Sequence, residues 1–305
     1  MEKVKKYLSL LFFPLICLML FSSCWKENLD HCWQGRIQIN IYAEKFQNAE
    51  NEKEDVFSER IRSLHYFLYH EGVLVEKGLA RDFEGLSTSA YTFERNKLPF
   101  GHYQLLLFGN TDSKQVLTGN PDDPSTLMVA YPGCENNEDY FACQYEFTLD
   151  CDCGYSGEAL MQRMHGVVQY QIKNIPDNIT EIEVSMNHLG TMCDANLTVC
   201  NPPFELSHRL PFDSETSNRS CTLTLGVFPT LPENKTVLNL VLYADNDYSF
   251  AVYRKQITDQ AQIYPNQLLR VDVLFPENGI LEDVDFGIVI NPKWDGSHEG
   301  DIEIK

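Results

Sequence analysis

The amino-acid sequence predicts an all-β protein with two β-sandwich domains in tandem, preceded by an N-terminal signal peptide. Helical periodicity is nearly absent after the N-terminal segment. Short runs instead alternate apolar and polar residues, which is the pattern of strands with one buried face. Gly, Pro, Asn or Asp residues end these runs. A chain of 305 residues is also long enough to form two domains, each with its own core.

The chain begins with a basic head, an apolar run, and small residues before a cysteine. These features are Lys3, Lys5 and Lys6, then residues 8–21, then Ser22 and Ser23 before Cys24. At about 1.5 Å per residue, an apolar run of about fourteen residues falls short of a ~30 Å hydrocarbon core. The segment 1–23 is therefore predicted to be a signal peptide and not a membrane-spanning helix.

The Phe-Ser-Ser-Cys stretch at residues 21–24 resembles the lipobox of bacterial lipoproteins. We expect Cys24 to receive a diacylglyceryl group and to become the mature N-terminus, followed by a lipidated linker over residues 24–34. Acyl chains hold a protein on a membrane without a spanning helix. Two alternatives stay open, namely a secretory signal cleaved elsewhere and an uncleaved N-terminal anchor.

The net charge of −20 excludes some classes of partner. A surface this acidic repels phosphate, which argues against nucleic acid and against charge-driven docking on anionic lipid. It is typical of a soluble domain outside the cytoplasm.

Eight cysteines remain after Cys17, in the signal peptide, and the acylated Cys24 are set aside. They are Cys32, Cys134, Cys143, Cys151, Cys153, Cys193, Cys200 and Cys221. An even number in an exported chain predicts disulfides, although the pairing cannot be derived from the sequence. We expect Cys151 and Cys153 to be half-cystines with different partners. A zinc site on Cys134, Cys143, Cys151 and Cys153 is the weaker alternative, because paired CxxC motifs or added histidines are missing.

The first half contains a series of strand-like runs, at residues 37–41, 61–69, 73–79, 104–108, 127–131 and 145–150. Ile37, Ile39 and Ile41 alternate with polar residues, which predicts a strand with one buried face. His70-Glu71-Gly72 predicts a hairpin, because glycine tolerates the positive φ of a tight turn. Residues 111–138 are rich in Asp, Asn, Pro and Gly and predict a loop that includes a short helix.

A second series of strand-like runs follows the cluster at residues 151–154. The runs fall at residues 167–172, 179–186, 221–228, 237–244, 250–257, 268–275 and 287–290. Leu269, Val271 and Val273 are the expected buried alternates of one of these strands. We therefore predict domains at residues 35–153 and 154–305, the second ending in a terminal strand and an acidic tail.

Several motifs come in an order that resembles a known family. They are the lipobox at Cys24 with Cys32 nearby, the hairpin at residues 61–79, Leu98-Pro99-x-Gly101-x-Tyr103, residues 165–176 (HGVVQYQIKNIP) and Asn291-x-x-Trp294. Together they resemble the FimB-type fimbrial anchor family of Bacteroidales, the base subunits of type V pili. The similarity spans almost the whole mature chain, and the order and spacing of the motifs carry it.

This resemblance implies two transthyretin-like β-sandwich domains and a lipid anchor in the outer membrane, with the domains on the cell surface. It also implies a role in cell adhesion as the anchor or a minor assembly subunit of a fimbria, with the neighbouring shaft subunit as partner. Binding would occur by β-strand addition, in which main-chain hydrogen bonds supply affinity and alternate side chains fill pockets. Arg36, just before the first strand, is expected to be a solvated flanking residue and not a processing site.

No catalytic constellation is found in the sequence. The histidines are scattered and form no HExxH pair, and no Gly-x-Ser-x-Gly elbow or phosphate-binding glycine loop occurs. They are His31, His65, His70, His102, His165, His188, His208 and His298. Glu282, Asp283 and Asp285 are expected to be a solvated acidic stretch, and Asp245-Asn246-Asp247 a turn. We predict no enzymatic activity, no metal and no cofactor.

Two other function classes stay open. A surface glycan-binding lipoprotein would have similar composition and anchoring, with exposed aromatic residues stacking on sugar rings. A hydrolase with an accessory sandwich would need a cleft with perturbed carboxylates, for which the sequence offers no specific signal.

Overall fold

The computed structural model confirms an all-β chain. It describes residues 34–45, 53–81, 83, 86–112, 116–133, 139–200, 202–211, 219–244, 251–276, 285–291 and 302–303. Two short 3-10 turns, Phe57–Glu59 and Pro124–Thr126, interrupt the strands. No helix among these residues combines the length and apolar character needed to cross a bilayer. The signal peptide and linker residues 24–33, Cys24 among them, lie outside the described residues, and Gln34, the last residue of the predicted linker, is the first residue of a strand.

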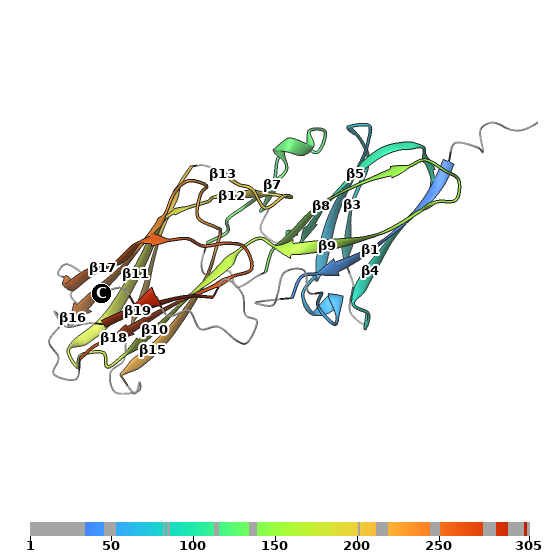
Figure 1. Ribbon diagram of the computed structural model, residues 1–305. Helices are drawn as coiled ribbons and strands as arrows, with labels where there is room; N and C mark the ends of the chain where they lie inside the picture. Colours follow the sequence, from blue (N-terminus) through green and yellow to red (C-terminus); the bar gives the residue numbers. More distant parts are fainter. Residues whose placement is uncertain are drawn as a thin grey trace, which may run out of the picture.

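The first half forms a seven-stranded sheet with the order β3-β2-β5-β8-β9-β1-β4. Its strands are β1 (Gln34–Ala43), β2 (Ser63–His70), β3 (Val73–Arg81), β4 (Ala90–Pro99), β5 (Gly101–Gly109), β8 (Phe141–Leu149) and β9 (Tyr155–Arg163). The sheet folds over between β8 and β9, where only two residue pairs join the strands. The N-terminal sandwich thus has one layer of β3, β2, β5 and β8 and another of β9, β1 and β4 (Figure 1).

Alternating apolar residues fill the space between these layers. Ile37, Ile39 and Ile41 of β1 are fully buried, as the alternation predicts, and pack in one cluster with Leu105 and Leu107 of β5. Their alternate neighbours point to the other face, because successive side chains of a strand leave on opposite sides.

The Gly101-x-Tyr103 motif forms the corner between β4 and β5. Gly101 has a φ of +147°, and a Cβ there would collide with the side chains of His70 and Glu71. The buried Tyr103 donates its hydroxyl hydrogen to the Pro99 carbonyl at 2.7 Å. A side chain at position 101 would therefore separate this corner from the β2–β3 hairpin.

The second half has two sheets, with the orders β15-β10-β18-β19-β20 and β14-β11-β16-β17. Their strands are β10 (Gly166–Lys173), β11 (Ile179–Leu189), β14 (Phe204–Pro211), β15 (Ser220–Val227), β16 (Thr236–Ala244), β17 (Ala251–Ala261), β18 (Leu268–Leu274), β19 (Asp285–Asn291) and β20 (Ile302–Glu303). A second core lies between the sheets, and it includes Leu269, Val271 and Val273 as predicted. We call this unit the C-terminal sandwich.

A third, smaller sheet joins the two halves. It has the order β13-β12-β7-β6, with β6 (Leu117–Thr118), β7 (Met128–Ala130), β12 (Met192–Asp194) and β13 (Val199–Cys200). Because β7 comes from the first half and β12 from the second, their pairing connects segments far apart in sequence. A third hydrophobic cluster, which contains Phe108, Val129 and Phe228, lies at the same junction. The sandwiches lie end to end and give an elongated outline (Figure 1).

The segment at residues 111–133 agrees with its prediction, because it contains only β6, β7 and one short 3-10 turn among its described residues. The domain limits and the transthyretin-like description of each half stay predictions. The expected division at residues 153 and 154 falls in the turn between β8 and β9. The strand after that division, β9, pairs with β1 in the N-terminal sandwich.

Candidate subunit interface

Sheet edges are the surfaces on which a partner strand can add, because their outer N–H and C=O groups have no ladder partner. The terminal strands of the sandwich sheets are β3 and β4 in the first half and β14, β15, β17 and β20 in the second. Several of them carry charged side chains, such as Lys77 and Arg81 on β3 and Arg209 on β14. Charges on an edge discourage indiscriminate pairing.

One pair of edges is tied together by an ion pair. The Arg95 guanidinium on β4 donates to both carboxylate oxygens of Glu76 on β3, with a shortest distance of 2.6 Å, and also to the Tyr66 hydroxyl at 2.9 Å. The hydrogen bond from Arg95 lowers the pKa of Glu76. This contact closes the N-terminal sandwich along its β3–β4 side.

The edge of β18 is covered by the chain itself. Strand β19 pairs antiparallel with β18 along its full length, from Leu268 opposite Asn291 to Leu274 opposite Asp285. Strand β18 also pairs with β10 on its other side and supplies core residues, so it is a central strand once β19 is in place. The C-terminal segment is thus an added strand on a completed sandwich.

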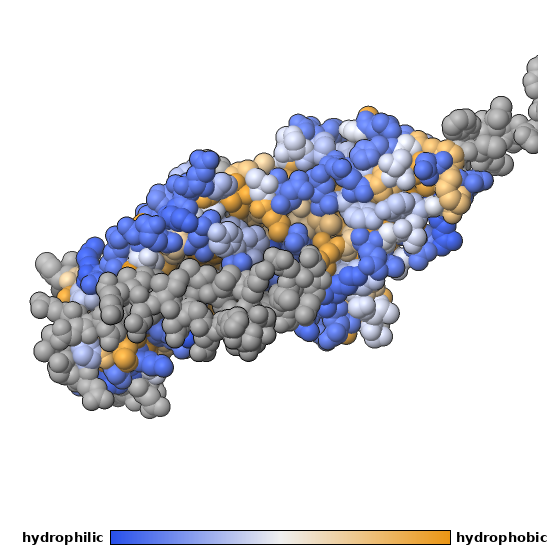
Figure 2. Space-filling view, in the orientation of Figure 1, coloured by the Kyte–Doolittle hydropathy of each residue, from blue (hydrophilic) through white to orange (hydrophobic). Residues whose placement is uncertain are grey.

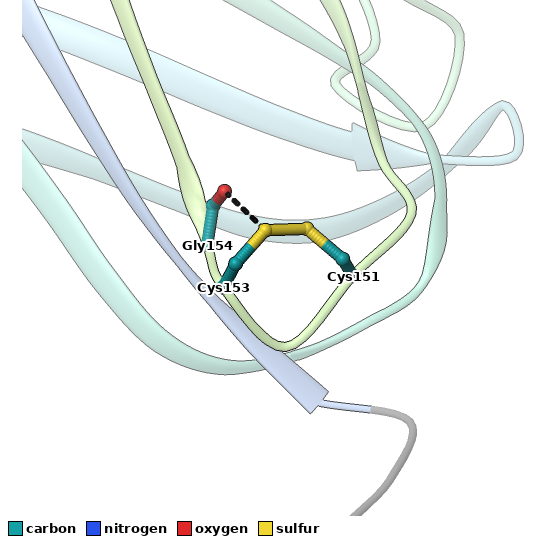
Figure 3. Close-up of a disulfide and its surroundings, with 3 residues drawn as sticks. All are labelled: Cys151, Cys153 and Gly154. Carbon is teal, nitrogen blue, oxygen red and sulfur yellow. Dashed lines mark hydrogen bonds between the residues drawn. A yellow bond between two sulfur atoms is a disulfide. The ribbon is translucent and has the colours of Figure 1, made fainter.

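The turn between β8 and β9 contains a disulfide between Cys151 and Cys153 (Figure 3). The expectation that these residues pair with different partners is therefore wrong, because the tight turn brings both sulfur atoms to one side. The turn packs against the start of β1, where Gly35 lies against Leu149 and the Cys151 carbonyl. This places it beside the point at which the chain enters the first strand.

The other described cysteines, Cys143, Cys193, Cys200 and Cys221, are free thiols. Burial raises the pKa of Cys143 to about 12 and that of Cys221 to about 11, so these thiols stay protonated and act as small apolar groups. Cys32 and Cys134 lie outside the described residues, as does the predicted lipidation site Cys24. No cluster of metal-ligating side chains occurs in the described part of the chain.

A buried polar cluster lies at the junction of the sandwiches. Arg163, at the end of β9, forms an ion pair with Asp139, and His165 Nε2 lies 3.0 Å from the same carboxylate. The backbone N–H of Arg163 donates to Glu44 at the end of β1. The Asn266 amide in the turn before β18 donates to the Lys45 carbonyl at 3.0 Å. These contacts fix the short connection between the halves.

A cavity of about 600 Å³ lies over the outer face of the β2–β3 hairpin, against Thr111, Asp112 and residues 117–127. Its lining includes the apolar Phe67, Leu79 and Leu127 and the polar Lys77, Arg81 and Asp112. Phe67 is only 6 % exposed, so it offers no open ring face. No described residue of the lining pairs a carboxylate with a second carboxylate in the way a hydrolase needs.

The histidines do not converge on one site within the described regions. His65, His70, His188 and His165 make separate contacts with a threonine hydroxyl, two backbone carbonyls and a carboxylate, respectively. Arg36 is exposed and pairs with Glu94 across the β1–β4 ladder, 3.0 Å away, as expected of a flanking residue. His31 and His298 lie outside the described residues, as do residues 245–247 and the acidic residues Glu282 and Asp283. In the coloured part of Figure 2, hydrophilic residues cover much of the surface, and hydrophobic patches lie between them.

Solved structures share this fold at low sequence identity. A putative polysaccharide binding protein from Bacteroides thetaiotaomicron matches with a TM-score of 0.60 and 12 % identity, over 84 % of this chain and 96 % of the other. A putative adhesin from the same organism matches with a TM-score of 0.58 and 12 % identity, over 85 % and 96 %. The fimbrial anchor protein Mfa2 from Porphyromonas gingivalis matches with a TM-score of 0.54 and 13 % identity, over 85 % and 97 %.

No curated protein matches the sequence. The family model of fimbrillin-A associated anchor proteins Mfa1 and Mfa2, in contrast, matches residues 34–299. That match covers both sandwiches, the junction and the added strand β19, and it confirms the resemblance carried by the motifs. The chain therefore belongs to the family of fimbrillin-A associated anchor proteins.

Proposed function

We propose that this protein is the lipid-anchored base or a minor assembly subunit of a fimbria, which holds the neighbouring shaft subunit by β-strand addition. Membership of a fimbrial anchor family is the observation that carries the proposal. The lipobox ending at Cys24 supports the lipid anchor, and the added strand β19 supports strand addition as a contact this fold accepts. The outer membrane, with the sandwiches on the cell surface, is the proposed location.

The proposed lipid anchor is strong enough to hold the protein in the membrane. Each buried methylene contributes about 0.8 kcal/mol, so the two or three acyl chains of a bacterial lipoprotein hold the chain firmly where a single chain would not. The base of a fimbria has to resist the pull on the shaft. A covalent lipid at the mature N-terminus transmits that force directly into β1, the central strand of a three-stranded layer.

The lipid anchor is tested by Cys24→Ser, with Cys32→Ser as the matched control. Cells are fed a radioactive fatty acid, and the protein is isolated from washed envelopes. We expect label and envelope association to be lost in Cys24→Ser and kept in Cys32→Ser. Label that persists in Cys24→Ser, or release of the wild-type protein by high salt, contradicts the proposed anchor.

The role at the fimbrial base is tested by deletion of the gene and by affinity isolation from detergent extracts. We expect cells without the protein to shed fimbriae into the medium or to make fimbriae of altered length, and the tagged protein to isolate a shaft subunit. Unchanged fimbrial attachment and length, together with a protein isolated alone, would count against the role.

Glycan binding is the second candidate, and the cavity of about 600 Å³ is the observation that favours it. A putative polysaccharide binding protein shares the fold, but at 12 % identity this likeness concerns the fold alone. The described lining has no exposed ring on which a sugar can stack, which makes this candidate the weaker one. Binding on a glycan array that is lost in Leu79→Glu, with the melting temperature Tm unchanged, would favour it over anchoring.

A further inference from the structure

The two sandwiches repeat one topology. In the first, β1 lies between β4, antiparallel, and β9, parallel. In the second, β10 lies in the same way between β15 and β18. The opposite layers also correspond, because the order β3-β2-β5-β8 matches β14-β11-β16-β17. Strand β9 is therefore the counterpart of β18, and β8 is the counterpart of β17.

One position differs between the repeats. In the C-terminal sandwich, the edge of β18 that faces away from β10 is filled by β19. In the N-terminal sandwich, the equivalent edge of β9 pairs with β8 only at Gln162 and Arg163. Among the described residues, the remainder of β9, from Tyr155 to Met161, has a strand partner on its β1 side alone. This stretch is as long as β19, which has 7 residues.

Side chains of β8 occupy the open edge. The Tyr145 hydroxyl faces the backbone beside Gly157 and Glu158, and the Cys143 thiol faces the backbone of Leu160. The Tyr145 hydroxyl also lies 2.7 Å from that of Tyr155. These two backbone groups would otherwise belong to a strand ladder, so the β8 side chains stand in for a missing strand.

Gly157 permits this arrangement. It immediately precedes Glu158, and a Cβ there would collide with the Tyr145 hydroxyl. The ring of Tyr155 stacks on buried Phe147 with centroids 4.8 Å apart, so the gap between β8 and β9 is lined by aromatic side chains. Tyr145 and Tyr155 are half-buried at its mouth. Rotation of Tyr145 toward solvent uncovers the edge without breaking any backbone ladder.

We propose that the outer edge of β9, residues 155–161, is the docking edge for an extended strand donated by the neighbouring fimbrial subunit. The donated strand runs antiparallel to β9, as β19 does to β18, and its backbone replaces the Tyr145 and Cys143 caps. This inference rests on the proposed function and specifies where that function takes place.

The repeated topology of the two sandwiches indicates what kind of strand the edge of β9 accepts. Strand β19, with the sequence DFGIVIN, shows that the equivalent edge accepts a short apolar strand. The chain's own β19 is already paired with β18, and so is that of any second copy, so the donor is a different subunit. Asp150 and Asp152 are exposed in the turn next to Tyr155. In the antiparallel orientation they meet the carboxyl end of the donated strand, which favours a Lys or Arg there.

Photo-crosslinking in fimbriated cells tests the site with the full lipidated chain. A photoreactive p-benzoylphenylalanine replaces Glu158, which is exposed beside the edge, and in the control it replaces Thr222, which is exposed on the free edge strand β15. We expect the variant at 158, and not that at 222, to form an adduct with the mass of one fimbrial subunit.

Each other result is decisive. An adduct at 222 without one at 158 overturns the inference and leaves the proposed function standing. An adduct at 158 with twice the mass of this chain assigns the edge to a second copy and overturns the choice of partner. If neither position forms an adduct and no shaft subunit co-purifies, the proposed function itself fails.

Two substitutions at the edge of β9 should have opposite effects on the amount of shaft subunit that co-purifies with the protein. Tyr145→Phe removes the hydroxyl that caps Glu158, and we expect about two- to tenfold more shaft subunit to co-purify. Glu158→Pro removes the N–H that the donated strand needs, and we expect about tenfold less. Tyr243→Phe, which removes a hydroxyl bonded to Glu183 in the C-terminal sandwich, is the control and should change nothing. Equal losses in both edge variants would indicate a purely structural role and overturn the inference.

Discussion

Single side chains decide how the two sandwiches are joined. Arg163 is only 2 % exposed, so its charge needs a compensating partner at the junction. Asp139 supplies that charge and is also held by His165. Burial would raise the pKa of the Asp139 carboxyl, but the hydrogen bond from His165 and the charge of Arg163 outweigh it and lower the pKa from 3.8 to about 2. The junction therefore depends on an ionised Asp139.

This lowered pKa predicts a pH-dependent stability. The folded-state pKa lies below the unfolded one, so the contribution is complete above about pH 4 and is lost as the pH falls toward about 2. We expect Asp139→Asn to lower the free energy of unfolding by about 2 kcal/mol at pH 7, and the deficit relative to wild type to shrink below about pH 4. Urea denaturation across this range measures it. Asp272→Asn, at an exposed pair with Arg270, should cost less than about 1 kcal/mol, and a deficit for Asp139→Asn that does not depend on pH contradicts the assignment.

Among the strands, β19 has the clearest separate role. It covers the edge of β18, whose Leu269, Val271 and Val273 belong to the core. Without β19, a long apolar strand would present an unpaired edge, which invites pairing with another chain. We therefore expect the added strand β19 to protect this edge from pairing with another chain.

Truncation tests this role. Removal of residues 279–305 should lower Tm by at least about 5 °C, which corresponds to a loss of about 2 kcal/mol in a protein of this size, and should produce dimers or larger species. Removal of residues 292–305 keeps β19 and should leave the protein monomeric with a nearly unchanged Tm. Light scattering coupled to gel filtration separates the two results. If the variant without residues 279–305 is monomeric and as stable as the full chain, β18 does not need its partner strand.

The junction of the two sandwiches has both a shared ladder and a shared core. The β7–β12 pairing and the cluster around Phe228 combine residues from both halves. The Phe228 ring lies 5.4 Å from that of Tyr131, whose hydroxyl donates to the Gly226 carbonyl at 2.9 Å. The proposed role, in which tension passes from a lipid anchor to a shaft, would benefit from a junction with both kinds of contact.

Removal of the Phe228 ring should uncouple the halves. Phe228→Ala leaves a cavity at the junction and should cost about 3–5 kcal/mol. Phe275→Ala removes a ring that is equally buried, but within the C-terminal core, and should cost a similar amount. Calorimetry should resolve two unfolding transitions for Phe228→Ala and a single one for Phe275→Ala. A single transition in both would mean that the β7–β12 ladder is enough to couple the sandwiches.

Much of the fold was predictable from local pattern. The alternation at Ile37, Ile39 and Ile41 identified a strand and its buried face, and His70-Glu71-Gly72 identified the turn of the β2–β3 hairpin. Three long strands were missed, namely β4, β9 and β14. Strands β4 and β14 are edge strands with charged residues and few buried positions, so their alternation is weak. In β9, the run Glu158-Ala159-Leu160-Met161-Gln162 favours a helix, and pairing with β1 overrides that preference.

The acidic charge, the all-β class and the anchor family were therefore readable from the sequence, because they depend on composition, on local alternation and on the order of short motifs along the chain, and the lipobox at Cys24 stays a prediction. The pairing of Cys151 with Cys153, the junction at Arg163, the repeated topology and the uncovered edge of β9 were not readable from the sequence. Each of these depends on segments that meet only after the chain has folded. Strand order is decided by long-range burial and backbone hydrogen bonding, and it leaves no local trace in the amino-acid sequence.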